Sequence, residues 1–231
     1  MRNSDLADLL SNRIHAHHAR QTPNRRTLVA IAGGPGSGKS SIAASISDAV
    51  SKKGLKCQAV SIEGFIKPTD QLSPHQQQSK GAIDTFDGDA VVDFFRKLRE
   101  LGPGHELSCP GVDEDGKFEP IPDAESVHAD SEVVVFEGIY MLADQDPWRQ
   151  IEHLVDEKWF IYVQPDLVRQ RVAERRMSKG KAGSMEESLW SYDEGDAKNN
   201  DFIAECRYAT DLVIESNEEI AIRWPDGTME W

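Results

Sequence analysis

A glycine-rich segment at residues 33–40 constrains the fold of this chain more than any other stretch. Its letters, GGPGSGKS, match the pattern G-x-x-x-x-G-K-[ST] of a phosphate-binding loop. Residues 27–32 before it form an apolar run typical of a buried strand, and residues 41–50 after it carry apolar side chains at helical spacing. The segment therefore joins a strand to a helix, where backbone N–H groups and the helix dipole can hold a phosphate.

The loop predicts which side chains contact a nucleotide. Lys39 is expected to reach the β- and γ-phosphates of ATP and to stabilise the transferring group, and Ser40 is expected to ligate Mg²⁺. The alternative is a glycine-rich turn without a ligand, which the strand–loop–helix context disfavours. The other residues expected to bind ATP are Gly34, Pro35, Gly36, Ser37, Gly38 and Ser41.

Charge and composition narrow the class of partner. The chain has 231 residues, with 26 Lys and Arg against 40 Asp and Glu, for a net charge of −14. A nucleic-acid partner, which needs a positive surface, is therefore not expected. No apolar run approaches the roughly 18 residues of a membrane span, and the N-terminus lacks the apolar region of a signal peptide. We expect a cytoplasmic protein with reduced thiols, because no metal spacing or even disulfide count fits Cys57, Cys109 and Cys206.

Strands alternate with helices along the chain. Buried strands are expected near residues 27–32, 55–62, 133–136, 158–163 and 211–215, with an edge strand at 220–224. Helices are expected near residues 41–50, 87–100, 146–154, 166–177 and, with breaks, 185–204. This alternation predicts one α/β domain over residues 1–231, a three-layer α/β/α P-loop NTPase with a five-stranded parallel core sheet.

Three segments are expected to lie outside that core. Residues 1–22 are expected to hold an amphipathic helix packed on the domain, and residues from about 175 to 187 a lid. Residues from about 63 to 128 are expected to form acceptor-side insertions, with 69–82 as a mobile loop or a short helix. Within these insertions, residues 113–116 resemble part of a calcium loop, but the ligand spacing favours a hairpin turn.

Four charged residues predict phosphoryl transfer beyond nucleotide binding. Glu137 ends a buried strand, which is where an acidic residue can hold Mg²⁺ or its water shell. Arg171 and Arg175 are one helical turn apart before the lid and are expected to close over the phosphates. Glu63 ends the neighbouring strand, where it could accept a proton from an acceptor hydroxyl. Each residue also has a simpler interpretation. Glu137 could cap the turn after its strand, the two arginines could belong to a solvated basic helix face, and Glu63 could be an ordinary loop acid.

Further segments resemble those of a known family. They read KGAIDTFD at 80–87, VVVFEGIY at 133–140, RVAERR at 171–176 and D-x-x-N at 196–199 followed by Ile203. With the loop, they resemble the uridine kinase, phosphoribulokinase and pantothenate kinase group of P-loop kinases. The chain is most similar to a fungal and bacterial branch of kinase-like ATPases in that group. The resemblance covers about residues 28–215 and implies a kinase that uses ATP and Mg²⁺.

Departures from that branch fall on the side expected to face the acceptor. Residues 63–66 read EGFI where the branch has D-G-F-H, and 110–114 read PGVDE where it has P-G-F-D-H. Gly195 stands where the branch has Asn. The nucleotide half therefore looks intact while the acceptor half is changed, with Glu63, Ile66 and Val112 expected to face the acceptor.

Two functions follow from this pattern. The first is transfer of the γ-phosphoryl group of ATP to a hydroxyl, or a nitrogen, of a small metabolite, nucleoside-like or otherwise. That acceptor could be cationic, which Glu63 and Glu114 would suit. The alternative is an ATPase or ATP-binding module without acceptor phosphorylation. A GTP switch is disfavoured because no N-K-x-D segment is present. The oligomeric state stays open, with a homodimer among the alternatives.

Overall fold

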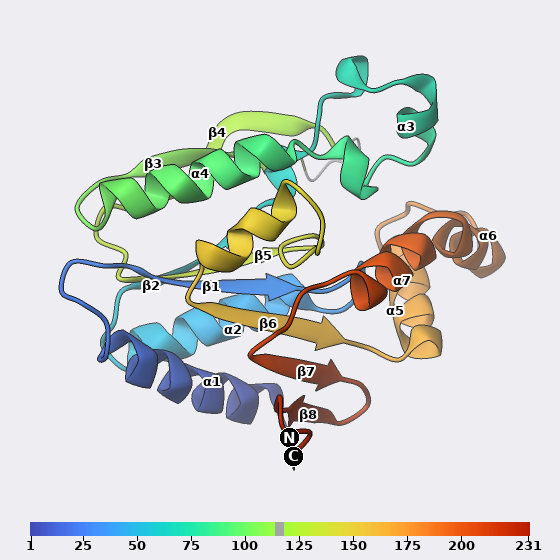
Figure 1. Ribbon diagram of the computed structural model, residues 1–231. Coiled ribbons are helices and arrows are strands. Elements are labelled where there is room, and N and C mark those ends of the chain that lie inside the picture. Colours follow the sequence, from blue (N-terminus) through green and yellow to red (C-terminus); the bar gives the residue numbers. More distant parts are fainter. Residues whose placement is uncertain (114–117) are drawn as a thin grey trace.

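The computed structural model describes residues 1–113 and 118–231, built around one large sheet (Figure 1). Across this seven-stranded sheet the order is β2 (Cys57–Ser61), β5 (Val133–Gly138), β1 (Thr27–Ala32), β6 (Glu157–Tyr162), β7 (Leu212–Ser216), β8 (Ile220–Arg223) and β9 (Met229–Glu230). The first five strands pair in parallel, whereas β8 and β9 are antiparallel. The predicted five-stranded parallel core is therefore confirmed. The strand expected at residues 220–224 forms as β8, but β9 pairs with its outer side and is the edge strand.

Helices cover both faces of this sheet, which confirms the predicted three layers. Helices α1 (Asn3–His18) and α2 (Lys39–Lys52) lie below the sheet in Figure 1, and α4 (Gly88–Leu101) and the short 3-10 helix Trp148–His153 lie above it. Alternate residues of β1 point to the two layers, because side chains of a strand alternate between its faces. Leu28 and Ala30 pack into the cluster that holds α4, and Val29 and Ile31 pack into the cluster that holds α1 and α2.

Helix α4 shows how local sequence builds a layer. The Asp87 carboxylate accepts a hydrogen bond from the Ala90 N–H at 3.0 Å and so caps the first turn. The apolar residues on the inner face of the helix are all buried: Val91, Val92, Phe94, Phe95 and Leu98. Phe95 meets Phe136 of β5 with ring centroids 4.6 Å apart, which fastens the helix to the centre of the sheet.

The segment between β2 and β5 lies largely outside the main sheet. It begins with short helices at Glu63–Phe65, Thr69–Gln71, α3 (Pro74–Gln78) and Ile83–Thr85. After α4 it forms an antiparallel hairpin of β3 (Leu107–Val112) and β4 (Pro120–Val127). The stretch 69–82, expected as a loop or a short helix, holds α3. Residues 114–116 of the turn predicted at 113–116, and with them the carboxylate of Glu114, lie outside the described residues.

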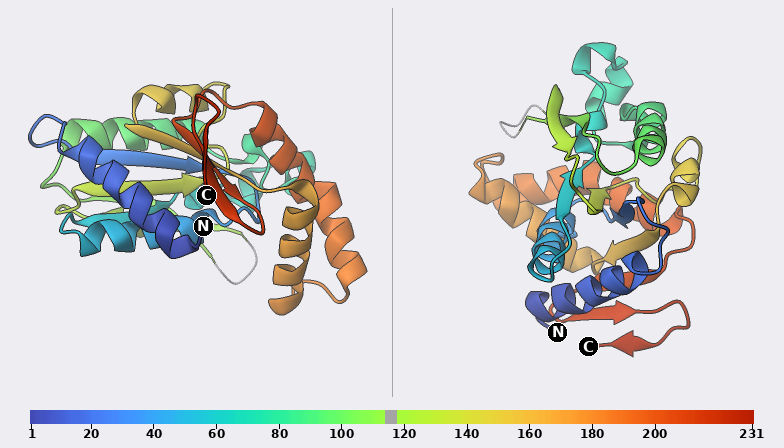
Figure 2. Two further views of the ribbon diagram at one scale, coloured as in Figure 1. Left: turned by 90° about the horizontal axis from the view of Figure 1, so that it is seen from below. Right: turned by 90° about the vertical axis from the view of Figure 1, so that its left-hand side faces the viewer.

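A group of helices lies beyond the ends of β6 and β1 (Figure 2). It consists of α5 (Pro165–Ser178), α6 (Met185–Ser191), a π-helical turn at Tyr192–Asp196 and α7 (Ala197–Glu205). Helices α5 and α6 pack against each other. The segment expected as a lid, residues 175–187, comprises the end of α5, the connection at 179–184 and the start of α6. Among the described helices, none has the length and apolar character needed to span a membrane.

Candidate active site

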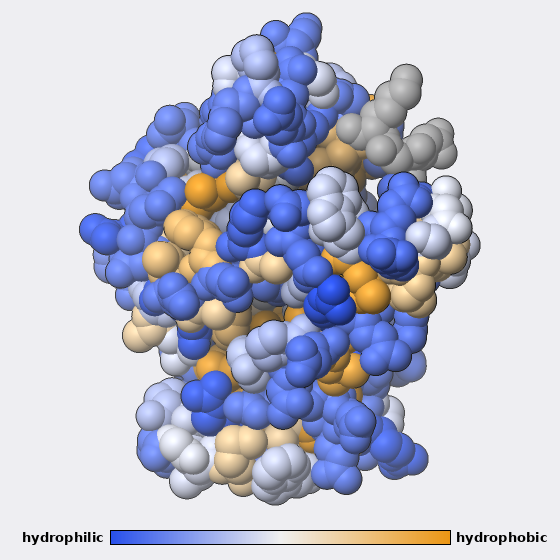
Figure 3. Space-filling model, turned by 90° about the vertical axis from the view of Figure 1, so that its right-hand side faces the viewer, coloured by the Kyte–Doolittle hydropathy of each residue, from blue (hydrophilic) through white to orange (hydrophobic). Residues whose placement is uncertain are grey.

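The carboxyl ends of three strands bring the site together. Parallel pairing sets Glu137 of β5 beside Ile31 of β1 and Ser61 of β2. The glycine-rich loop leaves the end of β1, and Glu63 follows closely after the end of β2. Since parallel strands end at the same edge of a sheet, loop and carboxylates converge there. Figure 3 shows this side of the molecule, which is mostly hydrophilic with a few apolar residues between the polar ones.

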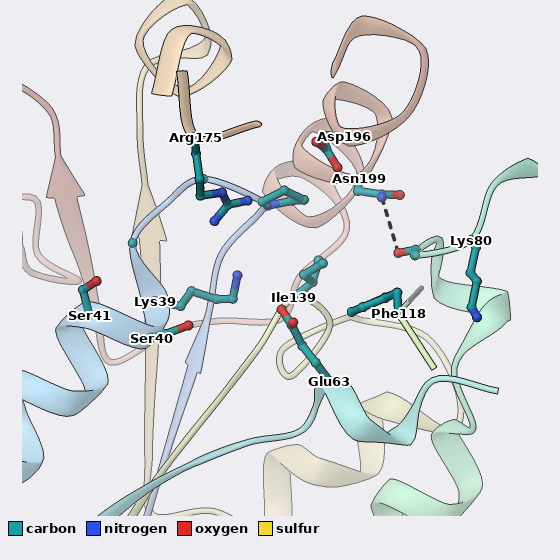
Figure 4. Close-up of a pocket in the computed structure, with 14 residues that line it drawn as sticks. Lys39, Ser40, Ser41, Glu63, Lys80, Phe118, Ile139, Arg175, Asp196 and Asn199 are labelled. Carbon is teal, nitrogen blue, oxygen red and sulfur yellow. Dashed lines mark hydrogen bonds between the residues drawn. The ribbon is translucent and has the colours of Figure 1, made fainter. Parts of the chain in front are cut away.

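A cavity of about 380 Å³ lies at this edge (Figure 4). One wall is formed by the loop and the start of α2, through Pro35, Gly36 and residues 38–41. Of the loop residues predicted to bind ATP, these line the cavity, whereas Gly34 and Ser37 lie behind its surface. The shape of the cavity therefore agrees with a phosphate held by the loop, although Ser37 contributes no side chain to it.

Lys39 begins helix α2 at the edge of the cavity. Gly38 before it has a φ of +90°, a left-handed conformation that favours glycine, and this turns the chain from the loop into the helix. The Lys39 ammonium group donates a hydrogen bond to the Gly34 carbonyl oxygen at 3.3 Å and is almost fully buried. This position lets the ammonium group contact phosphate oxygens that the loop would hold.

Ser40 and Glu137 form an oxygen pair that fits a magnesium ion. The Ser40 hydroxyl donates to Glu137 Oε1 at 3.0 Å. Glu137 is 4% exposed, and its second oxygen, Oε2, is buried without a hydrogen-bond partner among the described residues. In the same described part, His, Cys, Asp and Glu side chains nowhere group in threes around a possible metal position. Mg²⁺ commonly takes one or two protein oxygens and completes its shell with water and nucleotide phosphates, so this sparse donor set suits it.

Glu63 faces Lys39 across the cavity. It begins the short helix Glu63–Phe65, and its carboxylate points into the same space as the Lys39 ammonium group (Figure 4). Burial raises the pKa of Glu63; the positive charge of Lys39 opposes that rise, and the negative charge of Glu137 adds to it. A carboxylate with a raised pKa beside a phosphate site is suited to accept a proton from a bound hydroxyl group.

The two arginines predicted to close over the phosphates separate in the structure. Arg175 lines the cavity and reaches into it from α5 (Figure 4). The Arg171 guanidinium group instead donates to the carbonyl oxygens of Ser216 at 2.7 Å and Asn217 at 3.1 Å, at the end of β7. The expectation that Arg171 contacts the phosphates finds no support in this structure, because these carbonyl groups hold its side chain away from the cavity.

The expected acceptor-facing residues also separate. Ile66 is 2% exposed and packs into the core on the α4 side of the sheet. Val112 is partly buried against the same core and does not line the cavity. Of the three residues expected to face the acceptor, only Glu63 lines the cavity. Ile66 is part of the core and not of the cavity wall.

Two further residues of the cavity wall, Asp196 and Asn199, lie in a segment that resembles the family pattern. Asp196 closes the π-helical turn, and its carboxylate accepts a hydrogen bond from Arg176 at 2.9 Å. Burial raises the pKa of Asp196, and the positive charges of Arg176, Arg175 and Lys39 oppose that rise. Asn199 lies one turn further and donates to the Gly81 carbonyl oxygen at 3.3 Å. Their spacing of three within a helical segment was the available signal, because such residues share a face.

A polar cluster joins the segment before α4 to the β3–β4 hairpin. Lys80 lines the cavity, and its ammonium group binds Glu119 Oε1 at 2.6 Å and the Thr69 hydroxyl at 2.7 Å. The Thr69 hydroxyl and N–H groups also donate to the Glu119 carboxylate, the latter at 3.1 Å. These hydrogen bonds, from Lys80 first and then Thr69, lower the pKa of Glu119 to about 2. Sequence reasoning missed this cluster because its members are far apart in the chain.

The apolar part of the cavity wall comes from Phe118 and Ile139. The cavity thus has a cationic side with Lys39 and Arg175, and a mixed side with carboxylate, amide and apolar groups. The site combines three features: a phosphate-binding loop between a strand and a helix, Glu137 at a strand end beside Ser40 of the loop, and a cavity that Arg175 reaches into. This combination is typical of a P-loop kinase.

Comparison with known proteins identifies the family. The sequence model of the Phosphoribulokinase / Uridine kinase family matches residues 28–223, so the chain belongs to that family. A Schizosaccharomyces pombe protein provisionally named uridine kinase C227.14 is 29% identical over 198 residues, which cover 83% of each chain.

Solved structures agree with this assignment. A structure from Silicibacter sp. TM1040, provisionally named a fructose transport system kinase, is 25% identical with a TM-score of 0.82, covering 90% of this chain and 98% of that one. D-glycerate 3-kinase from Cryptococcus neoformans is 16% identical with a TM-score of 0.65, covering 97% and 98% of the two chains. At that identity the second likeness shows the fold alone. The family implies that this chain uses ATP.

Proposed function

We propose that this protein transfers the γ-phosphoryl group of ATP to a hydroxyl group of a small molecule. The observation that carries the proposal is Glu63, a partly buried carboxylate that faces Lys39 across the cavity. An ATP-binding module would need Lys39 and the loop alone. A carboxylate with a raised pKa on the opposite wall is useful when a second molecule must lose a proton there.

The residues divide the work of the reaction. The Glu63 carboxylate takes the proton of the acceptor hydroxyl, the hydroxyl oxygen bonds to the γ-phosphorus, and the bond from that phosphorus to the β-phosphate oxygen breaks to release ADP. Lys39 and Arg175 stabilise the negative charge on the transferring group. Ser40 and Glu137 would hold Mg²⁺, which when bound supplies positive charge to the β- and γ-phosphates.

The names of relatives support a hydroxyl acceptor. Uridine and fructose, which occur in those names, both carry hydroxyl groups. A nucleoside-like acceptor is one member of this class, and a nitrogen acceptor remains the variant that the same base would serve. We further infer a cytoplasmic protein, supported by three free cysteines, which suit a reducing compartment.

A metabolite screen tests the proposal. ADP release is measured with Mg²⁺ and ATP against a panel of hydroxyl- and amine-bearing metabolites, followed by mass spectrometry of any product. One acceptor is expected to stimulate ADP release strongly and to gain one phosphoryl group. ADP release that no acceptor stimulates would instead support an ATPase.

Variants then assign the roles. With the acceptor identified, Glu63→Gln is expected to lower transfer by roughly 10²–10⁴-fold while ATP affinity changes little. Lys39→Met is expected to abolish turnover, since the transferring charge loses its main cation. Glu174→Gln on the exposed side of α5 is the matched control and is expected to behave like wild type. Unchanged transfer by Glu63→Gln would rule out Glu63 as the base.

A further inference from the structure

Asn200 of α7 touches the phosphate-binding loop without lining the cavity. Its Nδ2 group donates to the Pro35 carbonyl oxygen at 3.2 Å, which ties the helix to the loop. The Asp196 carbonyl oxygen at 3.1 Å and the Tyr192 hydroxyl oxygen at 3.3 Å lie within hydrogen-bond distance of the same nitrogen, so its two N–H donors are shared among three acceptors. One side chain thus joins the loop to both ends of the π-helical turn.

The loop is shaped to accept this side chain. A Cβ atom on Gly34 would lie 1.7 Å from Asn200 Oδ1 and 3.0 Å from the Asn200 Cα atom. Any side chain at position 34 would therefore collide with the Asn200 amide group and crowd the backbone of α7. Gly34 does not line the cavity, so the glycine is not needed there to make room for a ligand. It is needed to make room for Asn200.

The element that Asn200 holds carries part of the cavity wall. Tyr192 is 4% exposed and packs into the core beside α5, which anchors the start of the π-helical turn. Asp196 at its end and Asn199 one turn later both line the cavity, on the side away from Lys39 (Figure 4). π-helical turns often occur at functional sites, where the extra residue redirects side chains. A shift of the loop would therefore be passed to Asp196 and Asn199 through Asn200.

We propose that Asn200 is a positioning residue that couples nucleotide binding in the loop to the placement of Asp196 and Asn199. Phosphates bound by the loop fix the Pro35 carbonyl group, which fixes the Asn200 amide group and with it the π-helical turn. The coupling is reciprocal, since two events linked through one contact each favour the other. This inference requires ATP binding only, and it goes beyond the proposed acceptor chemistry.

Amide hydrogen exchange of the full chain, with and without Mg²⁺ and ATP, tests the coupling. In the wild type, ATP is expected to slow exchange in the loop at 33–41 and also in 192–205. In Asn200→Ala, ATP is expected to protect the loop but to leave 192–205 close to its ATP-free rate. The ATP dissociation constant is expected to rise by only about fivefold, as for the loss of one hydrogen bond. Lys198→Ala, at an exposed position of the same helix, is the control and is expected to keep both effects.

Two results would overturn the inference. One is protection of 192–205 by ATP in Asn200→Ala to the same extent as in the wild type. The other is a wild type in which ATP protects the loop but never 192–205. Both readouts involve ATP alone, so they are independent of whether Glu63→Gln impairs acceptor phosphorylation.

A variant on the loop side keeps the test decisive if Asn200→Ala folds poorly. Gly34→Ala is expected to lose most ATP binding, because its Cβ atom collides with Asn200 Oδ1. The double variant Gly34→Ala with Asn200→Ala removes that oxygen and is expected to recover part of the ATP affinity without recovering protection of 192–205. Equal ATP affinity in the single and double variants would contradict the proposed contact.

Discussion

At the residue scale, spacing along a helix does not determine what a long side chain reaches. Arg171 and Arg175 share a face of α5, yet they lie about 6 Å apart along its axis. Arg171 lies beside the carbonyl groups at the end of β7 and donates hydrogen bonds to them, whereas Arg175 lies beside the cavity. A guanidinium group takes the nearest acceptors that satisfy its planar donors, so one turn separates a structural arginine from one at the site.

Glu63 is also expected to carry a cost in stability. Burial raises its pKa above the usual value of 4.5, so the folded protein binds this proton more tightly than the unfolded chain does. Stability should therefore fall as pH rises from about 4.5 through the folded pKa, and the loss should be complete above it. Glu63→Gln lacks this term and is expected to have a higher Tm than wild type at pH 7, with the difference closing near pH 4.

Thermal unfolding from pH 4 to pH 7 measures this difference, and the acid limb of kcat/KM provides a second check. As a base, Glu63 must be deprotonated, so activity is expected to fall on acidification with an apparent pKa above 4.5. A Tm difference that does not change with pH would argue against a perturbed Glu63.

At the element scale, the segment that precedes α4 depends on a few polar contacts for its position. Its middle part, residues 69–80, is largely exposed. Thr69 and Lys80, at the two ends of this part, both donate hydrogen bonds to the Glu119 carboxylate. Because Lys80 lines the cavity, this cluster determines the position of one part of the cavity wall. Such a segment is held by interactions that local sequence does not encode, since Glu119 belongs to the hairpin beyond α4.

Glu119→Gln is expected to loosen this segment without weakening ATP binding. Amide exchange in residues 69–80 should accelerate several-fold, because the charge-assisted bonds to Lys80 and Thr69 are lost. The lowered pKa of Glu119 means that its contribution is present above pH 4.5 and is lost as pH falls toward about 2. The wild type should therefore approach the variant in that acid range.

Glu106→Gln provides the matched control for this experiment. Its carboxylate lies at the base of the same hairpin and accepts a hydrogen bond from Ser126 on the neighbouring strand. Exchange in residues 69–80 should stay at the wild-type rate in this variant. Equal acceleration by both variants would show that the hairpin as a whole, and not Glu119, holds the segment.

At the scale of the whole molecule, a strongly acidic protein carries a local cationic site. The net charge is −14, yet Lys39 and Arg175 stand together at the loop. ATP binding therefore depends on a short-range site made where strand ends meet, because salt screens charges farther away than about 8–10 Å. Two apolar clusters on opposite faces of one sheet support that edge, so ligand binding there should stabilise the whole domain.

Thermal unfolding with Mg²⁺ and ATP checks this linkage. A ligand at 100 times its dissociation constant stabilises the folded state by about 2.7 kcal/mol, which corresponds to a rise in Tm of about 5–10 °C for a domain of this size. Lys39→Met is expected to lose most of that rise, and chelation of Mg²⁺ is expected to reduce it in the wild type. A full shift in Lys39→Met would place the nucleotide elsewhere.

The order of the core strands and helices, the phosphate-binding loop and the carboxylates at the strand ends could all be predicted from the sequence. These features are local: hydrophobic periodicity identifies an element, and the loop pattern places a turn between a strand and a helix. Glu137 and Glu63 could be predicted to meet the loop because parallel strands all end at one edge of their sheet.

Which other side chains reach the cavity depends on tertiary packing. Asp196, Asn199 and Lys80 line it, whereas Arg171 and Ile66 do not. The positions of these side chains depend on how α5, α7 and the hairpin pack beyond the sheet edge, through contacts between residues far apart in the chain. The direction and local partners of a side chain follow from that packing, and no periodicity within one segment records it.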